Sequence, residues 1–316
     1  MTYAFPELAG QRALLVASTG GHLEQLVQLE PVLGVSPQSQ WMTFDSPQSR
    51  SLLAGRDATI VPYIASRDWR GVIRAASEAT RLDWDSIDVV VSTGAALALS
   101  VFPVARLRRT PAFYIESVSR FDGPSLTGRL TQRLRLATTF TQHAEWATDQ
   151  WQYRYSVLSA YEAAAEPLAE DFGISRIFVT LGTIRPFRFD ALVDAVLAAA
   201  PEGAEIVWQL GETDRTDLPG KVHRTISVED FDREAMHADV VVTHAGVGST
   251  LRLLELGISP VLVPRRKARG EHIDDHQTQV ASQLAAAGLL QRVDAPDLEL
   301  QHLLQAAATR VHRTLD

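Results

Sequence analysis

The sequence predicts an α/β protein of two domains, each with a parallel sheet covered by helices on both sides. The chain has 316 residues, and a single hydrophobic core rarely grows beyond ~250–300 residues. Short apolar runs alternate with helical stretches in two separate series. The runs are apolar throughout, as expected of parallel strands buried on both faces.

The first series starts with the apolar run at residues 13–18, which stops at Gly20 and Gly21. A helical pattern of leucines follows directly. Further strands are expected, with helices between them, at residues 41–44, 59–64, 88–93, 111–116 and 138–142. This series predicts an N-terminal Rossmann-like domain over residues 1–157.

The alternation of expected strands and helices is interrupted between the two series. Residues 158–175 are rich in alanine and glutamate and include Pro167 and Gly173, so they are expected to connect the domains. The second series predicts a C-terminal Rossmann-like domain over residues 176–316. Its expected strands are 177–181, 205–210, 240–243 and 260–263, and its expected helices include 189–199, 274–287 and 298–313.

Composition limits the partners and the compartment. The net charge of -8 argues against general nucleic-acid binding. The chain has no cysteine, which excludes disulfides and thiolate zinc sites and fits a cytoplasmic protein. The N-terminus lacks the pattern of a signal peptide, and no stretch approaches the ~18 apolar residues of a membrane span. We therefore expect a cytoplasmic protein, whose contact with a membrane, if it has one, is peripheral on the inner face.

Positive charge is nevertheless concentrated in two places. Either group is read as solvated surface or as a contact with phosphates or an anionic membrane. The first group comprises Arg106, Arg108, Arg109, Arg129, Arg133 and Arg135, and the second Arg265, Arg266, Lys267 and Arg269.

The C-terminal domain carries a glycine-rich turn between a strand and a helix, at residues 242–250. Glycines let a phosphate approach the backbone, and the free N–H groups of a helix N-terminus favour an anion. Ser249 and Thr250 add hydroxyl donors, and His244 adds an imidazole. The turn is neither a Walker A loop nor a complete dinucleotide fingerprint.

A polar run follows the next strand, at residues 264–277. Glu271, Asp275 and Gln277 offer carboxylate and amide groups to sugar hydroxyls. Metal binding is the less favoured reading of this run, and helix capping is the simplest one.

In the N-terminal domain, His22 follows the first strand and Glu116 follows the strand at 111–116. A histidine at a helix start can act as a general base, because its pKa lies near working pH. Glu116 is expected to orient His22 or to compete with it for the proton. Structural roles for both residues stay open.

The donor half resembles the GT-B glycosyltransferases. The resemblance rests on His-Ala-Gly-x-Gly-Ser at 244–249, on Gly257 and Pro264, and on Asp-His-Gln at 275–277. It is closest to the catalytic subunit of the transferase that adds the second N-acetylglucosamine to a polyprenyl-diphosphate-linked sugar, and bacterial exopolysaccharide transferases are similar. The resemblance implies parallel sheets facing a cleft, with the uracil near residues 226–231.

The resemblance also implies the donor-binding residues of this chain. They are Gly182, Thr183, His244, Gly246, Gly248, Ser249, Thr250, Glu271, Asp275 and Gln277. In the wider superfamily an acid eight positions after the histidine binds the ribose. Arg252 stands there in this sequence. Glu255, the nearest acid, is therefore also predicted as a donor-binding residue, in the place of the ribose-binding acid.

The N-terminal half resembles the anchor subunit of the same two-part transferase. The shared features are Gly-Gly-His at 20–22, Ser-Thr-Gly at 92–94, Ile-Glu-Ser at 115–117, Ser-Leu-Thr-Gly at 125–128 and Gln142. The chain therefore resembles a fusion of the anchor and catalytic subunits. The implied acceptor-binding residues are Gly21, Ser117, Arg120, Ser125 and Thr127.

Together these features predict an inverting, UDP-sugar-dependent glycosyltransferase that acts on an acceptor saccharide, with a lipid-linked acceptor implied by the resemblance. The donor would be held without a metal or other cofactor. Two alternatives stay open: an enzyme similar to UDP-GlcNAc 2-epimerase, and a non-catalytic sugar-nucleotide-binding scaffold, which Arg252 favours.

Overall fold

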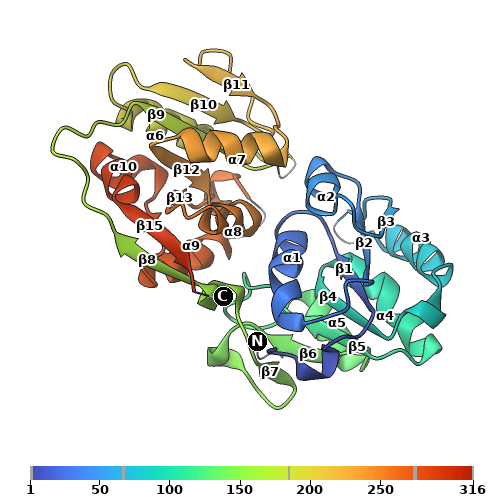
Figure 1. Cartoon of the computed structure of the whole chain (residues 1–316). Helices are drawn as coiled ribbons and strands as arrows, with labels where there is room; N and C mark the ends of the chain where they lie inside the picture. Colours follow the sequence, from blue (N-terminus) through green and yellow to red (C-terminus); the bar gives the residue numbers. More distant parts are fainter. Residues whose placement is uncertain (1–2, 66–67, 184–185, 273–275, 315–316) are drawn as a thin grey trace. The chain divides into compact units, whose positions relative to one another are not determined.

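The computed structural model describes residues 3–65, 68–183, 186–272 and 276–314. The chain divides into two compact units, Met1–Ser159 and Ala160–Asp316 (Figure 1). Each unit contains one parallel sheet with helices packed on it, as the apolar runs predict.

The N-terminal unit is built on a seven-stranded sheet in the order β3-β2-β1-β4-β5-β6-β7, and all its neighbouring strands are parallel. The central strand β1 is buried along its whole length, because helices cover both faces of a parallel sheet. The strands are β1 (Ala13–Ala17), β2 (Gln40–Phe44), β3 (Ala58–Val61), β4 (Val89–Gly94), β5 (Ala112–Ile115), β6 (Thr138–Thr141) and β7 (Trp151–Tyr153).

Five α-helices of this unit are described. The residues that end α1 and α4 adopt left-handed backbone conformations, which stop a helix. The helices are α1 (Gly21–Leu33), α2 (Pro47–Leu52), α3 (Trp69–Thr80), α4 (Ala96–Arg108) and α5 (Leu126–Arg133), with the 3-10 turns η1 (Pro6–Leu8), η2 (Trp84–Ser86), η3 (Ala144–Trp146) and η4 (Val157–Ala160).

The C-terminal unit has a six-stranded parallel sheet in the order β11-β10-β9-β12-β13-β14. Its strands are β9 (Arg176–Thr180), β10 (Glu205–Gln209), β11 (Lys221–His223), β12 (Val240–His244), β13 (Val261–Val263) and β14 (Gln291–Arg292). Its helices are α6 (Asp190–Ala199), α7 (Val228–His237), α8 (Val247–Glu255), α9 (His276–Ala286) and α10 (Leu300–Ala307), with the 3-10 turns η5 (Lys267–Arg269) and η6 (Ala295–Asp297).

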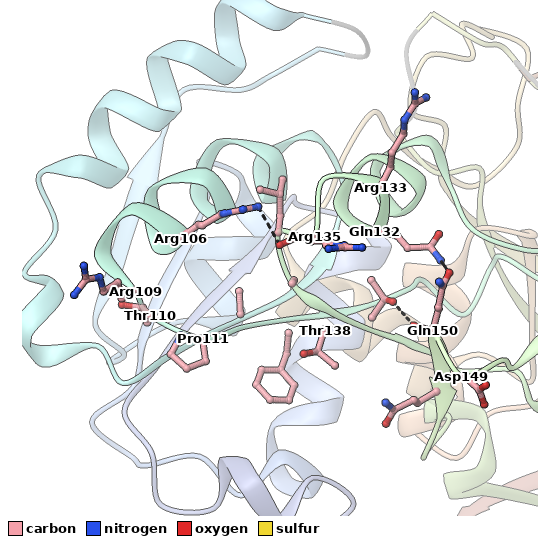
Figure 2. A pocket seen from close by; sticks show the side chains of 16 residues that line it. Arg106, Arg109, Thr110, Pro111, Gln132, Arg133, Arg135, Thr138, Asp149 and Gln150 are labelled. Atoms are coloured by element: carbon pink, nitrogen blue, oxygen red, sulfur yellow. Dashed lines mark hydrogen bonds between the residues drawn. The ribbon is translucent and has the colours of Figure 1, made fainter.

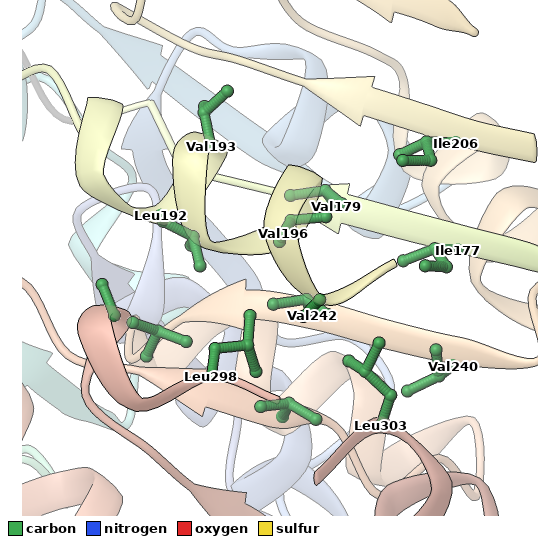
Figure 3. Close-up of a cluster of buried hydrophobic side chains, with 14 of the residues drawn as sticks. Ile177, Val179, Leu192, Val193, Val196, Ile206, Val240, Val242, Leu298 and Leu303 are labelled. Carbon is green, nitrogen blue, oxygen red and sulfur yellow. The ribbon is translucent and has the colours of Figure 1, made fainter. Parts of the chain in front are cut away.

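The alternation of side chains along β9 explains why this sheet is apolar on both faces. Ile177 and Val179 point into a core that α6 and α10 complete with Val196 and Leu303 (Figure 3). Phe178 points the other way, into a second core formed with α7 and α8. Successive residues of a strand face opposite sides, so an unbroken apolar run serves two helical layers.

Two predicted segments differ from the structure. The helix predicted over 298–313 ends at Ala307, and β15 (Thr309–Arg313) follows it. β15 pairs in antiparallel fashion with β8 (Tyr161–Ala165), which lies inside the predicted connection 158–175. The physical reason is a set of partners distant in the sequence. β-branched Thr309 and Val311 favour extended backbone, β8 pairs with it along its length, and the Gly257 carbonyl accepts from the N–H of Val311 at 3.0 Å.

Within the described residues, no helix is both long and apolar enough to cross a membrane.

The core packing of α10 yields a stability prediction. Leu303 is fully buried, whereas Leu300 on the same helix is 42% exposed. Leu303→Ala should lower the free energy of unfolding of the C-terminal unit by about 2–5 kcal/mol, because the lost methyl groups leave a cavity. Leu300→Ala, the matched control, should change it by less than about 0.5 kcal/mol. Urea unfolding followed by circular dichroism measures both, and equal losses would contradict this packing.

Candidate active site

Strand order reverses once in each parallel sheet, between β1 and β4 and between β9 and β12. Ligands of open α/β sheets bind beyond the carboxyl ends of the strands at such a point. His22 follows β1, and His244 is the last residue of β12. Each unit therefore places one predicted site histidine at its ligand-binding edge.

His22 is held by β4. Its Nδ1 lies 2.7 Å from the carbonyl oxygen of Thr93, and the Thr93 hydroxyl donates to the His22 carbonyl at 2.8 Å. A carbonyl oxygen only accepts, so Nδ1 carries the proton and Nε2 keeps its lone pair. Burial lowers the pKa of His22, which favours the neutral ring that a general base requires.

Glu116, predicted as partner or rival of His22, is instead enclosed by donors from its own loop. Its carboxylate accepts from the N–H and hydroxyl of Ser125 at 2.8 and 3.0 Å, and from Tyr114 and Ser117 at 3.1 Å each. Among the described contacts none joins it to His22. Burial raises the pKa of Glu116 while the hydrogen bonds lower it. The geometry fits a residue that fixes the start of α5.

A buried amide network ties α1 to this loop. The sequence singled out Ser117 and Gln142 but not Gln25, which connects them. The amide of Gln25 donates to the Ser117 hydroxyl at 3.1 Å, and its oxygen accepts from the N–H of Val118 at 2.8 Å. Gln142 donates to both the Gln25 oxygen and the Glu116 carbonyl at 3.0 Å. Two segments that are distant in sequence are thus fixed against the helix that carries His22.

The other predicted acceptor residues surround the same edge. Ser125 caps α5 by accepting from Gly128 at 3.0 Å, and Arg120 lowers the pKa of His22 further through its charge. Gly21 and Thr127 are half-buried at the first turns of α1 and α5. Gly128 must lack a side chain, because a Cβ there would overlap the Glu116 carboxylate.

In the C-terminal unit, β12 leads through Ala245 and Gly246 into α8. Gly246 is the N-cap residue, and in the described structure no side chain caps this helix. Gly248 and Ser249 are half-buried in its first turn. The N–H groups of that turn are therefore available to an anion. The Thr250 hydroxyl, predicted to bind the donor, donates to the Gly246 carbonyl at 2.8 Å instead.

The His244 ring is packed between two glycines. A Cβ at Gly182 or at Gly246 would overlap ring atoms, and Gly182 also has a left-handed backbone with φ of 73°. Burial and the nearby charges of Arg265 and His272 lower the pKa of His244 to about 3. The ring is therefore neutral at pH 7, with one N–H to donate.

Arg265 organises this edge, although the sequence grouped it with surface cations. Its side chain is fully buried. It donates to the carbonyls of Leu181 at 2.7 Å, Arg188 at 3.0 Å, Glu271 at 3.1 Å and Phe187 at 3.2 Å. One guanidinium thus joins the loop after β9 to the loop after β13.

Burial lowers the pKa of Arg265 to about 10, so the group stays charged at neutral pH. The guanidinium also lies over the Phe189 ring, 4.7 Å from its centroid, a favourable cation–π arrangement. The sequence predicted a solvated surface group or a contact with phosphates or a membrane; in the structure Arg265 is buried and donates to carbonyls of its own chain.

Two residues predicted to bind the sugar instead accept hydrogen bonds from the backbone of the loop that follows β13. Glu271 accepts from the N–H of Arg266 at 2.8 Å, and Gln277 accepts from the N–H of Arg265 at 3.2 Å. Both side chains are buried. Asp275 lies outside the described residues, and Thr183 is exposed beyond β9.

Glu255 does not lie near the first turn of α8. It is the last residue of that helix, where it accepts from the Tyr161 hydroxyl at 2.8 Å and pairs with Arg313 at 2.7 Å. Arg252, in the position expected for the ribose-binding acid, pairs with Asp232 of α7 through an Nε–Oδ1 contact of 2.8 Å. The carboxylate beside Arg252, where the ribose-binding acid was expected, is therefore Asp232 of α7.

The comparisons with known proteins agree with this architecture. Residues 176–311 match the model of the glycosyltransferase family 28 C-terminal domain. The UDP-N-acetylglucosamine–N-acetylmuramyl-(pentapeptide) pyrophosphoryl-undecaprenol N-acetylglucosamine transferase of Halorhodospira halophila is 29% identical over 251 residues, which cover 75% of this chain and 67% of that protein. The enzyme of the same name from Synechococcus sp. (strain RCC307) is 27% identical over 311 residues, which cover 88% of this chain and 81% of that protein. The chain is a GT-B glycosyltransferase.

Solved structures of this type share the fold. MurG of Acinetobacter baumannii superposes with a TM-score of 0.55 at 19% identity, covering 93% of this chain and 89% of that one. CalG4, the calicheamicin glycosyltransferase, gives 0.57 at 16% identity, covering 94% and 90%. The non-catalytic scaffold reading of the sequence is not supported, and Arg252, the residue that favoured it, is neutralised by Asp232 in this transferase.

The Arg265 contacts generate a prediction. Arg265→Met should destabilise the C-terminal unit by about 3 kcal/mol or more and weaken donor binding, because several buried carbonyls lose their donor. Arg265→Lys should recover only part of both, since an ammonium cannot reproduce the planar fork. The control is Arg269→Met, which changes an exposed arginine of the same loop. Thermal unfolding and calorimetric titration with UDP are the measurements, and equal effects at 265 and 269 would refute the assignment.

Proposed function

We propose that the chain transfers a hexose-type sugar from a UDP-sugar to a hydroxyl of a lipid-linked saccharide, with inversion at the anomeric carbon. The observation that carries the proposal is the pair of switch-point histidines, one with a free lone pair and one beside an uncapped helix N-terminus. These are the groups that deprotonate an acceptor and stabilise a leaving diphosphate.

In the proposed transfer step, these groups take up the proton and stabilise the leaving group. Nε2 of His22 takes the proton of the acceptor hydroxyl, and the oxygen forms its bond to the anomeric carbon. The bond from that carbon to the diphosphate breaks, and its electron pair leaves with UDP. The N–H groups at the start of α8 and the neutral His244 ring stabilise the charge that grows on the diphosphate. We propose that no metal or other resident cofactor takes part, so that activity persists in EDTA.

The donor class is supported by the relatives. Their names specify UDP-N-acetylglucosamine as donor and pyrophosphoryl-undecaprenol as the acceptor carrier. UDP-N-acetylglucosamine is therefore the first donor to test. We assign the nucleoside end to the pair of Asp232 on α7 and Arg252 on α8, in place of Glu255.

A lipid carrier is also supported by the surface of the N-terminal unit. Tyr63, Trp69 and Ile73 expose 69%, 57% and 70% of their area, before and along α3. Arg70 and Arg74 lie on the same helix. Aromatic and aliphatic side chains flanked by arginines suit the boundary between lipid headgroups and acyl chains. We propose that this surface, the α3 patch, meets the membrane that holds the acceptor.

The proposal is tested by transfer from UDP-N-acetylglucosamine to a polyprenyl-diphosphate-linked sugar, in a short-chain soluble form and in a long-chain form in vesicles. UDP release together with an inverted glycosidic linkage is the expected result. The double variant Trp69→Ser/Ile73→Ser should raise KM for the vesicle-bound acceptor by about tenfold and leave KM for the soluble one unchanged. Hydrolysis or epimerisation of the donor without transfer would overturn the proposal.

The state of His22 predicts the pH dependence. A base acts when deprotonated, and burial lowers the pKa of His22, so kcat/KM should stay high down to a pH below the usual histidine pKa of about 6.5. His22→Gln should lower kcat by about 10²–10⁴-fold and remove the acidic limb. His223→Gln, at an exposed histidine of β11, serves as the control. An unchanged pH profile in His22→Gln would exclude His22 as the base.

A further inference from the structure

The two edges of the N-terminal sheet use their polar side chains differently. At the amino ends of β5 and β6, the exposed side chains of Arg109 and Arg133 lie at opposite ends of an open hollow and point apart (Figure 2). Arg106, in the same hollow, donates to the carbonyl of Leu134 at 2.7 Å, which joins the ends of α4 and α5. At the carboxyl ends, by contrast, polar side chains from α2 and β4 converge on the turn that carries His22.

This turn passes through a residue whose backbone requires glycine. Gly20, the N-cap residue of α1, has φ of 89° and ψ of -142°, a conformation that other residues rarely adopt. Glycine is also the residue that leaves such a conformation most easily, because its backbone is the least restricted. Among the described residues, no side chain caps α1 in the usual way. The turn therefore needs support from another element.

That support comes from Gln48 on α2. Its Oε1 accepts from the N–H of Gly20 at 2.6 Å, and its Nε2 donates to the carbonyl oxygen of Gly20 at 3.2 Å. These partners fix the orientation of the amide, since the N–H only donates and the carbonyl only accepts. We refer to the two bonds as the Gln48 clamp. One side chain thus holds both polar backbone groups of a residue 28 positions earlier in the sequence.

The helix that carries Gln48 is itself firmly held. Pro47 opens α2, and Ser46 and Ser49 form a capping box in which each hydroxyl accepts from the other residue's N–H at 3.0 Å. The Ser49 hydroxyl also donates at 2.7 Å to the carbonyl of Phe44, the last residue of β2. Gln48 lies between the two capping residues, so its backbone is fixed to the sheet. Less conformational entropy is then lost when its amide forms the clamp.

The clamp and β4 hold one short segment from two sides. His22 lies two residues after Gly20, and Thr93 binds both its ring and its carbonyl. A Cβ added at Gly94 would lie 3.1 Å from Cε1 of the His22 ring, so the ring has little room on that side. β4 therefore fixes the imidazole, and Gln48 fixes the backbone that leads to it. Such support matters to a base, because a misplacement of about 1 Å can cost about 10²-fold in rate.

We propose that Gln48 is a positioning residue for the transfer reaction, which holds the Gly20 turn so that Nε2 of His22 faces the acceptor hydroxyl. The inference rests on the function proposed above, in which His22 is the base. Gln48 acts through the backbone of Gly20 and does not touch the reacting atoms. Gly20 is exposed and Gln48 is half-buried, so water can replace the lost bonds in a variant. The clamp therefore adds order to the turn more than stability to the fold.

The test is Gln48→Met in the whole chain, because methionine keeps the length of the side chain and removes both bonds. With UDP-N-acetylglucosamine and the short-chain acceptor, kcat should fall by about tenfold or more. KM for the donor should stay within about twofold, since the groups that bind it lie in the C-terminal unit. The unfolding temperature should fall by less than about 4 °C. An unchanged kcat would overturn the proposal.

Amide hydrogen exchange measured by NMR tests the clamp without depending on activity. Exchange of the Gly20 N–H should be about tenfold faster or more in Gln48→Met, because this N–H loses its acceptor. The N–H of Gly246, which donates to the His244 carbonyl at 2.8 Å in the other unit, should not change. An unchanged rate at Gly20 would show that the turn is held without Gln48 and would overturn the proposal. Faster exchange at Gly20 in a chain whose wild type transfers no sugar would refute the proposed function and not the clamp.

Gln11→Met is the matched control. Gln11 is also half-buried, and its amide also donates to a backbone carbonyl, that of Glu7 at 3.0 Å. It precedes β1, however, at the amino end of the sheet. Both kcat and the exchange rate at Gly20 should therefore match the wild type. An equal loss of kcat in Gln11→Met would mean that any lost glutamine bond loosens the N-terminal unit, and it would refute a specific role for Gln48.

Discussion

The buried guanidinium of Arg265 is the interaction on which the donor edge depends. Loops beyond parallel strands leave carbonyl groups that the sheet cannot satisfy, and a buried carbonyl without a donor is costly. Arg265 serves four such carbonyls from two loops at once. Burial lowers the pKa of His244 most, and the charge of Arg265 lowers it further, so the histidine beside this guanidinium is neutral.

The N-terminal unit meets the same need with neutral groups. Gln25 and Gln142 satisfy the backbone beyond β5, and no charge is buried by them. The Glu116 carboxylate at this edge is surrounded by four donors. This environment leaves the His22 ring as the group with an unused acceptor. The two edges therefore share a topology but differ in electrostatics, which suits one to an uncharged hydroxyl and the other to a diphosphate.

The parts of this structure that local pattern determines could be predicted from the sequence. Strands such as β1, β9 and β12 were recognisable because burial on both faces makes them apolar throughout. The placement of His22 and His244 after strands followed from the same pattern. Arg265 was not recognisable, because its burial depends on carbonyls from a loop 77 to 84 residues earlier, and an arginine-rich run is typical of a protein surface. The same limit applies to β15, whose helical appearance was overridden by pairing with β8, and to Glu255, whose partners are Tyr161 and Arg313.

The pairing of β8 with β15 also has a consequence for synthesis on the ribosome. β8 is the first strand of the C-terminal unit to leave the ribosome, and β15 is made after every other described strand. At ordinary translation speeds β8 stays unpaired for on the order of ten seconds, exposing a strand edge that can join other chains. After Tyr161, β8 consists of one charged residue, Glu162, and three alanines, so it offers little apolar surface to other chains. The alanine-rich composition of β8, which led us to predict a connection between the domains, is thus suited to a strand that stays unpaired until β15 has been synthesised.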